Sequence, residues 1–182
     1  MGSGSPEPSR NAGAAPTSGT AVQTSGDVRP AGAPRAVTVV NEQDLPVDHV
    51  RLERLATHVL DVLDVPVELE LSIACVDTAR IAELNEDHLD GTGATDVLAF
   101  PIDGPDDVTA GVPGLLGDVV LCPAVAARQA PEHGRTAGAE IELLVVHGIL
   151  HLLGHDHAEP GERAEMFALT DELLARFAAA AP

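Results

Sequence analysis

The 182-residue sequence predicts a single α+β domain, in which a small mixed β-sheet is packed with helices. Segments with strand character come early in the chain and helical segments gather at its end, an order typical of α+β proteins. The composition, 45% hydrophobic and 21% charged, supplies one hydrophobic core. A chain of this length is too short for several domains.

Residues 1–35 differ from the rest of the chain. Gly, Pro, Ser, Ala and Thr fill 25 of these 35 positions, so little apolar surface is present to offset the entropy of ordering. We expect a disordered tail over 1–35 and the domain over 36–182. Neither a secretory signal nor a run of about 20 apolar residues is found, so we expect a cytoplasmic protein without a membrane segment.

The first half of the domain predicts strands over 36–40 and 67–76 with a helix between them over 47–63. The helix has apolar residues near helical spacing and ends before Pro66; they are Val50, Leu52, Leu55, Val59 and Leu63. The second strand alternates apolar and polar residues, which predicts one face toward a core. Its apolar positions are Val67, Leu69, Leu71 and Ile73.

The sequence predicts a helix over 77–85 next, with Asp77 as its N-cap. Two further strands, 96–102 and 118–122, are separated by a connector rich in Gly, Pro and Asp. Three helices complete the domain, over 123–132, 136–153 and 159–180. The two cysteines, Cys75 and Cys122, form no CxxC pair and stand in apolar stretches, so we interpret both as buried thiols.

The chain is strongly acidic, with 29 Asp and Glu against 10 basic residues and a formal net charge of −19. Every basic residue is arginine. Residues 36–182 hold seven arginines and 27 acidic residues, a net charge of −20. Such a domain lacks the clustered cations with which a general nucleic-acid binder displaces counterions from phosphates.

Four of the eight histidines fall within HGILHLLGHDH, residues 147–157. On a helix, His147 and His151 stand about one turn apart on one face, the spacing with which two imidazoles bind one tetrahedral metal. An adjacent apolar stripe can seat the same helix on the sheet: Ile141, Leu144, Val145, Gly148 and Leu152. Gly154 can adopt a left-handed conformation and end the helix. By spacing alone, either His155 or His157 could then supply a third nitrogen.

Three imidazoles would leave the fourth zinc position to water, as in catalytic rather than structural sites. Zinc lowers the pKa of its bound water toward about 7, which makes hydroxide available at neutral pH. Nickel and copper also suit three imidazoles. The simpler alternative is an amphipathic helix that carries solvated histidines.

The spacing through His157 is also that of metzincin peptidases, in which a glutamate general base follows the first histidine. Here that position is Gly148, which cannot move a proton. Glu142 projects from another face of the helix, and Glu140 lies two turns away, roughly 10 Å. A phosphodiester depends more on metal charge at the developing oxyanion and leaving group, so it is the better substrate for this site.

Three motifs, taken together, closely resemble the YbeY family of metal-dependent endoribonucleases, which mature ribosomal RNA. They are LNEDHLDGTGATDVLAFP at 84–101, LGDVVLCP at 116–123 and HGILHLLGHDH at 147–157. The resemblance covers residues 37–178 in the family's order and spacing. It implies a small mixed sheet with helices and a metal in a cleft, in agreement with the element order.

The resemblance implies that His147, His151 and His157 bind one zinc ion per chain and act through its water. Asp156 is then interpreted as a residue that orients a ligand through a hydrogen bond, or as a polar turn residue. His155 occupies a place where the family often has an aromatic residue or histidine. The activity implied is single-strand-specific endonucleolytic maturation of the 3′ end of 16S rRNA and ribosome quality control, with ribosomal RNA and ribosomal proteins as partners.

Two positions depart from the family pattern. Many members have an arginine, thought to meet the RNA phosphate, where this chain has Leu89, so another arginine must reach the cleft or activity is weaker. The arginines available for this role are Arg51, Arg54, Arg80, Arg128, Arg135, Arg163 and Arg176. Serine is usual before the Phe-Pro pair, where this chain has Ala99.

Other residues of the motifs have two interpretations each. Thr95, Asp96 and Phe100 match the family; Asp96 is a candidate near the substrate, and Phe100 can stack on a base or pack on its strand. Asp118 can face the cleft or cap a strand turn.

Other functions stay open beside a zinc endoribonuclease. A non-catalytic ribosome assembly factor stabilised by zinc is favoured by Leu89, whereas a metalloprotease is disfavoured by Gly148. A zinc sensor or store fits poorly with an open site. Because the domain is so acidic, we also expect weak binding to free RNA with a shallow salt dependence, and recruitment by a ribosomal partner.

Overall fold

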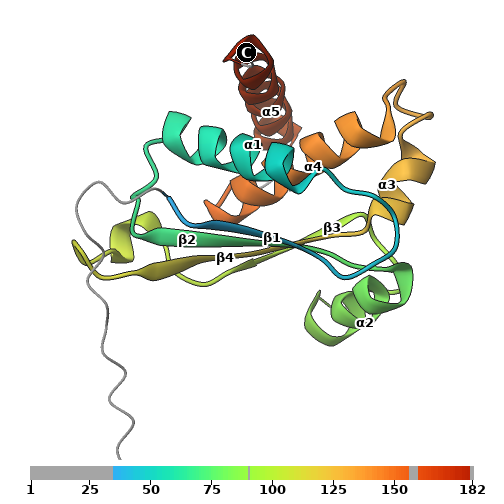
Figure 1. Ribbon diagram of the computed structural model, residues 1–182, viewed down its shortest axis with the longest axis horizontal. Helices are drawn as coiled ribbons and strands as arrows, with labels where there is room; N and C mark the ends of the chain where they lie inside the picture. The colour runs from blue at the N-terminus through green and yellow to red at the C-terminus, as the bar shows by residue number, and fades with distance from the viewer. Residues whose placement is uncertain (1–34, 90, 156–159, 181–182) are drawn as a thin grey trace, which may run out of the picture.

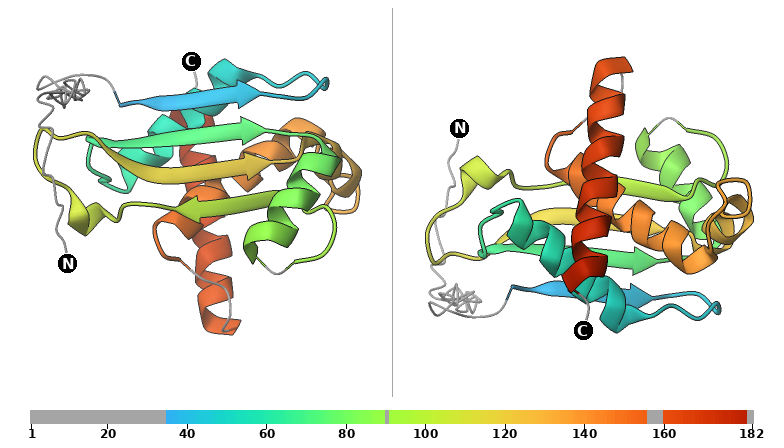
Figure 2. Two further views of the ribbon diagram at one scale, coloured as in Figure 1. Left: turned by 90° about the horizontal axis from the view of Figure 1, so that it is seen from below. Right: turned by 90° about the horizontal axis from the view of Figure 1, so that it is seen from above.

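The computed structural model describes residues 35–89, 91–155 and 160–180. The proposed tail, residues 1–35, thus lies outside this part except for its last residue. A four-stranded sheet forms the centre of the molecule (Figures 1 and 2). Its strands are β1 (Val37–Asn41), β2 (Leu69–Cys75), β3 (Val97–Pro101) and β4 (Gly114–Leu121), in the order β1-β2-β4-β3.

The sheet is mixed, as the sequence predicts. β2 is parallel to both β1 and β4, and β3 is antiparallel to β4. The last strand begins at Gly114, four residues before the predicted start at Asp118. The connector before it contains only a short 3-10 helix, η1 (Pro105–Asp107).

The helices fall on two sides of the sheet (Figure 1). α1, α4 and α5 cover one face, and α2 lies below the other face near one end. Their bounds are α1 (His49–Val62), α2 (Thr78–Leu89), α3 (Pro123–Gln129), α4 (Ala137–Leu152) and α5 (Pro160–Ala180). In the described part of the chain, no helix is both long and apolar enough to span a membrane.

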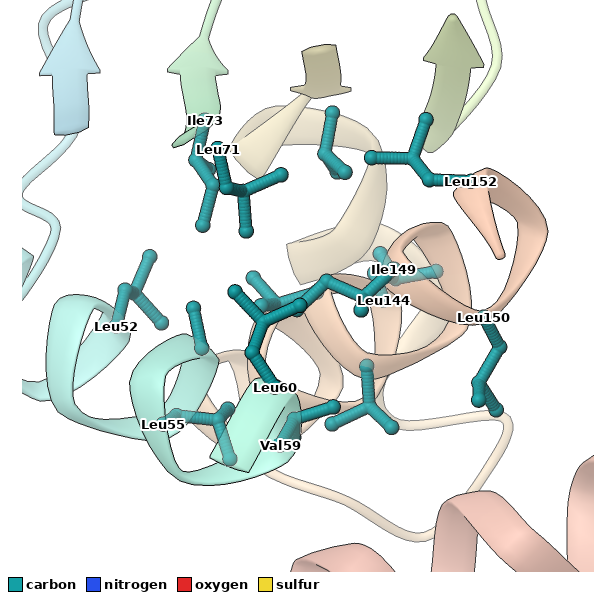
Figure 3. Close-up of a cluster of buried hydrophobic side chains, with 14 of the residues drawn as sticks. Leu52, Leu55, Val59, Leu60, Leu71, Ile73, Leu144, Ile149, Leu150 and Leu152 are labelled. Carbon is teal, nitrogen blue, oxygen red and sulfur yellow. The ribbon is translucent and has the colours of Figure 1, made fainter. Parts of the chain in front are cut away.

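The main core lies between the sheet and the helices α1 and α4 (Figure 3). Strand β2 alternates as predicted, with Leu69, Leu71 and Ile73 buried. Val67, predicted on the core face of this strand, instead precedes the strand and is 46% exposed. Val50, one of the apolar residues near helical spacing in α1, is 66% exposed. Val50 is two residues before Leu52, about 200° around the helix, so it falls on the opposite face from the buried stripe.

Local capping fixes where the helices begin and end. The Asp77 carboxylate accepts from Arg80 N–H at 2.8 Å, which confirms the predicted cap of α2. This helix runs past the predicted end at Asn85, whose side chain instead donates to Gly93 O at 3.0 Å. Thr136 caps α4 by accepting from Ala139 N–H at 3.2 Å.

Both cysteines are buried and free, as predicted. Burial raises the pKa of the Cys75 thiol to about 11. The thiolate, which is the reactive form, is therefore suppressed at neutral pH.

Candidate functional site

His147 and His151 lie side by side on α4, as their four-residue spacing predicts. Their ring centroids are 4.8 Å apart and the ring planes are nearly perpendicular, at 89°. Both rings line a pocket of about 340 Å³, called here the histidine pocket. Its walls are Thr95, Asp96, Val97, Ala99, His133, Glu140, Leu143, Leu144, His147, Gly148, His151 and Phe167.

The two rings border one space, because both line the histidine pocket and their centroids are 4.8 Å apart. Imidazole nitrogen is a ligand that zinc accepts, so the chemistry of this pair fits a zinc site.

The third expected ligand, His157, and its neighbour Asp156 lie outside the described residues. Within the ranges that are described, no group of three His, Cys, Asp or Glu side chains is gathered for a metal. Gly154 has φ +84°, the left-handed conformation expected to end α4. His155 comes next and is exposed, and its backbone N–H donates to Leu150 O at 3.0 Å.

Gly148 lets α4 approach the sheet closely. A Cβ at this position would lie 2.7 Å from Val119 Cγ1 and 3.1 Å from Val119 Cγ2. A glutamate side chain here would therefore clash with β4, which is a packing reason for the missing peptidase base.

Helix α5 closes one side of the histidine pocket with a ring that sequence reasoning missed. Phe167 stacks on His147, with centroids 5.8 Å apart and planes at 27°. The Arg163 guanidinium lies over the Phe167 ring, 5.9 Å from its centroid. Arg163 and Phe167 are four residues apart on the helix, and the packing of α5 on α4 brings Phe167 to His147.

Strand β3 and the residues before it form another wall. Asp96 lines the pocket, where its Oδ1 accepts from Val97 N–H at 2.8 Å and from the Thr95 hydroxyl at 3.1 Å. These bonds hold the start of the strand. Ala99 also lines the pocket.

A buried carboxylate lies at the far end of the pocket from His151. Glu140 is 2% exposed, although sequence reasoning assigned it no role. Its Oε1 lies 2.8 Å from His133 Nδ1, and its Oε2 accepts from Arg135 Nη1 at 3.5 Å. By contrast, Glu142 on another face of α4 pairs with Arg51, where the ion pair raises the pKa of the guanidinium.

Asp118 and Phe100 lie on the opposite face of the sheet from the histidines. Both line a second pocket of about 350 Å³, with Arg80 and His88 among its other walls. Phe100 packs edge-to-face against His88, with centroids 5.6 Å apart, which favours its interpretation as a packed strand residue. Because side chains alternate along a strand, Ala99 faces the histidine pocket and its neighbour Phe100 faces away.

Comparisons with known proteins agree with this fold and these motifs. The family model of endoribonuclease YbeY matches residues 38–178. The chain is 51% identical to endoribonuclease YbeY of Thermobifida fusca, covering 77% of this chain and 92% of the relative. It is 50% identical to endoribonuclease YbeY of a Nocardioides species, covering 79% and 99%.

A solved structure supports the same fold. The solution structure of a Thermotoga maritima protein aligns with a TM-score of 0.54 and 27% identity, covering 78% of this chain and 88% of the other. The match of the family model, over residues 38–178, includes all three motifs of the sequence. The chain therefore belongs to the endoribonuclease YbeY family.

Proposed function

We propose that the protein is a zinc-dependent endoribonuclease that cuts single-stranded RNA at the histidine pocket. The observation that carries the proposal is the His147 and His151 ring pair, 4.8 Å apart within a pocket, in a chain whose relatives are named endoribonucleases. The physiological substrate proposed is the 3′ end of 16S rRNA, with a role in ribosome quality control in the cytoplasm.

His147, His151 and His157 are the proposed zinc ligands. When bound, zinc supplies a water molecule of lowered pKa and positive charge near the scissile phosphate. The chain's own residues orient this chemistry. Phe167 stacks on His147 and restricts the motion of its ring, and Gly148 keeps α4 against the sheet. Asp156 is proposed to orient a ligand, and Asp96 to border the substrate.

We propose that Arg135 or Arg163 meets a substrate phosphate in place of the arginine that Leu89 replaces. Among the described residues, Arg135 bonds to Glu140 and Arg163 lies over Phe167, and both partners line the pocket. Each cation therefore stands beside the histidine pocket. Removal of either one should weaken RNA binding without loss of the fold.

The net charge of the chain, −19, argues that these local cations and the metal replace bulk attraction. We propose that a ribosomal partner, the ribosome or its small-subunit proteins, recruits the protein to its ribosomal RNA. Binding to naked RNA should then be weak, with a shallow dependence on salt, because few counterions are released. A steep salt slope on naked RNA would contradict this part of the proposal.

The second candidate is a non-catalytic, zinc-stabilised ribosome assembly factor, which Leu89 favours. A metalloprotease is disfavoured, because the space beside Gly148 has no room for a glutamate base. The assembly factor would bind RNA or its ribosomal partner with metal present and cut nothing.

The test is cleavage of a labelled single-stranded RNA and of a matched duplex by the full chain, with and without chelator. His151→Ala should abolish cleavage, whereas His49→Ala on α1 provides a histidine control outside the pocket. Wild type should cut the single strand only, and zinc should restore the chelated sample. Equal, chelator-insensitive cutting by wild type and His151→Ala would refute the assignment. A peptide substrate separates the protease alternative.

A further inference from the structure

His133 stands at the rim of the histidine pocket on a fixed piece of backbone. It lies in the turn between α3 and α4, where its N–H is shared between Gln129 O at 3.3 Å and Ala130 O at 3.2 Å. Arg135 N–H donates to Ala130 O at 2.9 Å and closes the same turn. The His133 side chain lines the pocket and is 46% exposed, so it can exchange protons with solvent.

Glu140 holds this imidazole by one nitrogen. The distance from His133 Nδ1 to the Glu140 carboxylate is 2.8 Å, and that carboxylate is 2% exposed. A buried carboxylate that accepts from Nδ1–H fixes the tautomer and the ring orientation, and leaves Nε2 to exchange a proton. In the part of the chain that is described, the hydrogen bond of the His133 ring joins its Nδ1 to the Glu140 carboxylate.

The Glu140–His133 pair and the His147–His151 pair occupy different ends of one pocket. Glu140 and His147 are seven residues apart on α4, a rise of about 10 Å. An in-line displacement at phosphorus also has two ends, since the attacking and leaving oxygens lie on opposite sides of the phosphorus atom. The pocket thus offers a metal-ligating pair at one end and a carboxylate-held imidazole at the other.

We propose that His133 is the general acid for the leaving oxygen in the RNA cleavage proposed above, and that Glu140 is its positioning residue. The inference rests on that proposed function. As the bond from the attacking oxygen to phosphorus forms, the bond from phosphorus to the leaving ribose oxygen breaks. His133 Nε2–H gives its proton to this oxygen, the attacking water loses its proton to solvent, and solvent returns a proton to Nε2.

The charged groups around His133 are compatible with this role. Glu140 faces it from α4 and Arg135 from its own turn, and Asp96 borders the same pocket on the side of β3. The carboxylate can balance the imidazolium before transfer, and the guanidinium shares that carboxylate. Gly148 supplies no competing acid or base at the other end.

The decisive experiment compares two substrates. One is ordinary RNA, and the other carries a single bridging sulfur in place of the leaving oxygen, prepared in both the 3′ and the 5′ bridging forms. A thiolate leaves without a proton, so loss of a general acid slows only the ordinary RNA. For His133→Ala, we expect kcat/KM on ordinary RNA to fall by about 10²–10⁴. We expect less than a tenfold change on the substrate with sulfur at the leaving position.

Three further variants make the result specific. Glu140→Gln keeps the volume of the buried side chain and should show a smaller loss on ordinary RNA with the same sulfur rescue. His49→Ala should match wild type on both substrates, and His151→Ala should lose both. An equal loss by His133→Ala on both substrates, or no loss on ordinary RNA, would overturn the assignment. Failure of wild type to cut either substrate would instead overturn the proposed function itself.

A measurement without metal or substrate tests the pair directly. In ¹⁵N NMR of histidine-labelled protein near neutral pH, the neutral form of His133 should be the Nδ1–H tautomer. The signals of His133 are identified as those that disappear in His133→Ala. Glu140→Gln should shift this ring toward the mixed tautomers of a free imidazole. A wild-type His133 with the mixed ratio would contradict the positioning role of Glu140.

Discussion

Replacement of Gly148 by alanine should destabilise the protein, even though alanine is the better helix former. The new Cβ would lie 2.7 Å from Val119 Cγ1, and Val119 is fully buried on the central strand β4. It would also meet Val97 Cγ2 at 3.4 Å. Because the sheet and α4 confine Val119, relief of the contact requires α4 or β4 to shift.

The two opposing effects have known sizes. Alanine in place of glycine in a helix stabilises by about 0.5–1 kcal/mol. An extra methyl in a tightly packed core costs about 1–3 kcal/mol. With one contact below 3.0 Å and a second near it, we take the cost as about 2 kcal/mol and the net loss as about 1 kcal/mol. For a domain of this size, that loss lowers Tm by about 2–4 °C.

Urea unfolding followed by circular dichroism measures the effect, with Gly138→Ala as the matched control. Gly138 lies in the same helix, and a Cβ there would meet no atom within 4 Å, so this variant should be as stable as wild type or more stable. In a Val119→Ala background, the added methyl of Gly148→Ala has room, and its cost should shrink or reverse. A Gly148→Ala protein at least as stable as wild type would refute the close-approach argument.

Three further predictions concern the thiol, the metal and the cap of α4. With its pKa raised to about 11, Cys75 should react with a thiol reagent at pH 8 far more slowly in the native protein than in urea, and the rate should rise toward pH 11; equal native and unfolded rates would contradict its burial. Removal of bound zinc with a chelator should lower Tm, because a ligand at 100 times its Kd stabilises by about 2.7 kcal/mol, and a chelator-insensitive Tm in zinc-loaded protein would count against the site. Thr136→Ala should cost about 1 kcal/mol by loss of the bond to Ala139 N–H, measured by urea unfolding against Thr136→Ser, which keeps the hydroxyl.

Much of the local structure could be predicted because it depends on short-range periodicity. Alternation along β2 placed Leu69, Leu71 and Ile73 in the core, and the four-residue spacing of His147 and His151 put both rings on one face of a helix. Gly154 ends that helix in a left-handed conformation, as a glycine after the last turn predicts. The motifs also led to the correct family.

The other walls of the candidate site could not be predicted, because they come from elements that meet only in the folded chain. Phe167 reaches His147 from a separate helix, and the burial of Glu140 depends on how the α3–α4 turn folds over it. Asp118 belongs to one of the three motifs that indicate the family, so the sequence left open that it faces the site. The alternation of side chains along β4 instead places it on the opposite face of the sheet.

The sequence by itself therefore determined the strands, the helices, the histidine pair and the family, since each depends on neighbours within a few residues or on a linear motif. Tertiary structure alone decided which side chains surround that pair. Packing brings distant segments within contact distance, and a shift of one residue in a strand or about 100° around a helix changes the face on which a side chain lies.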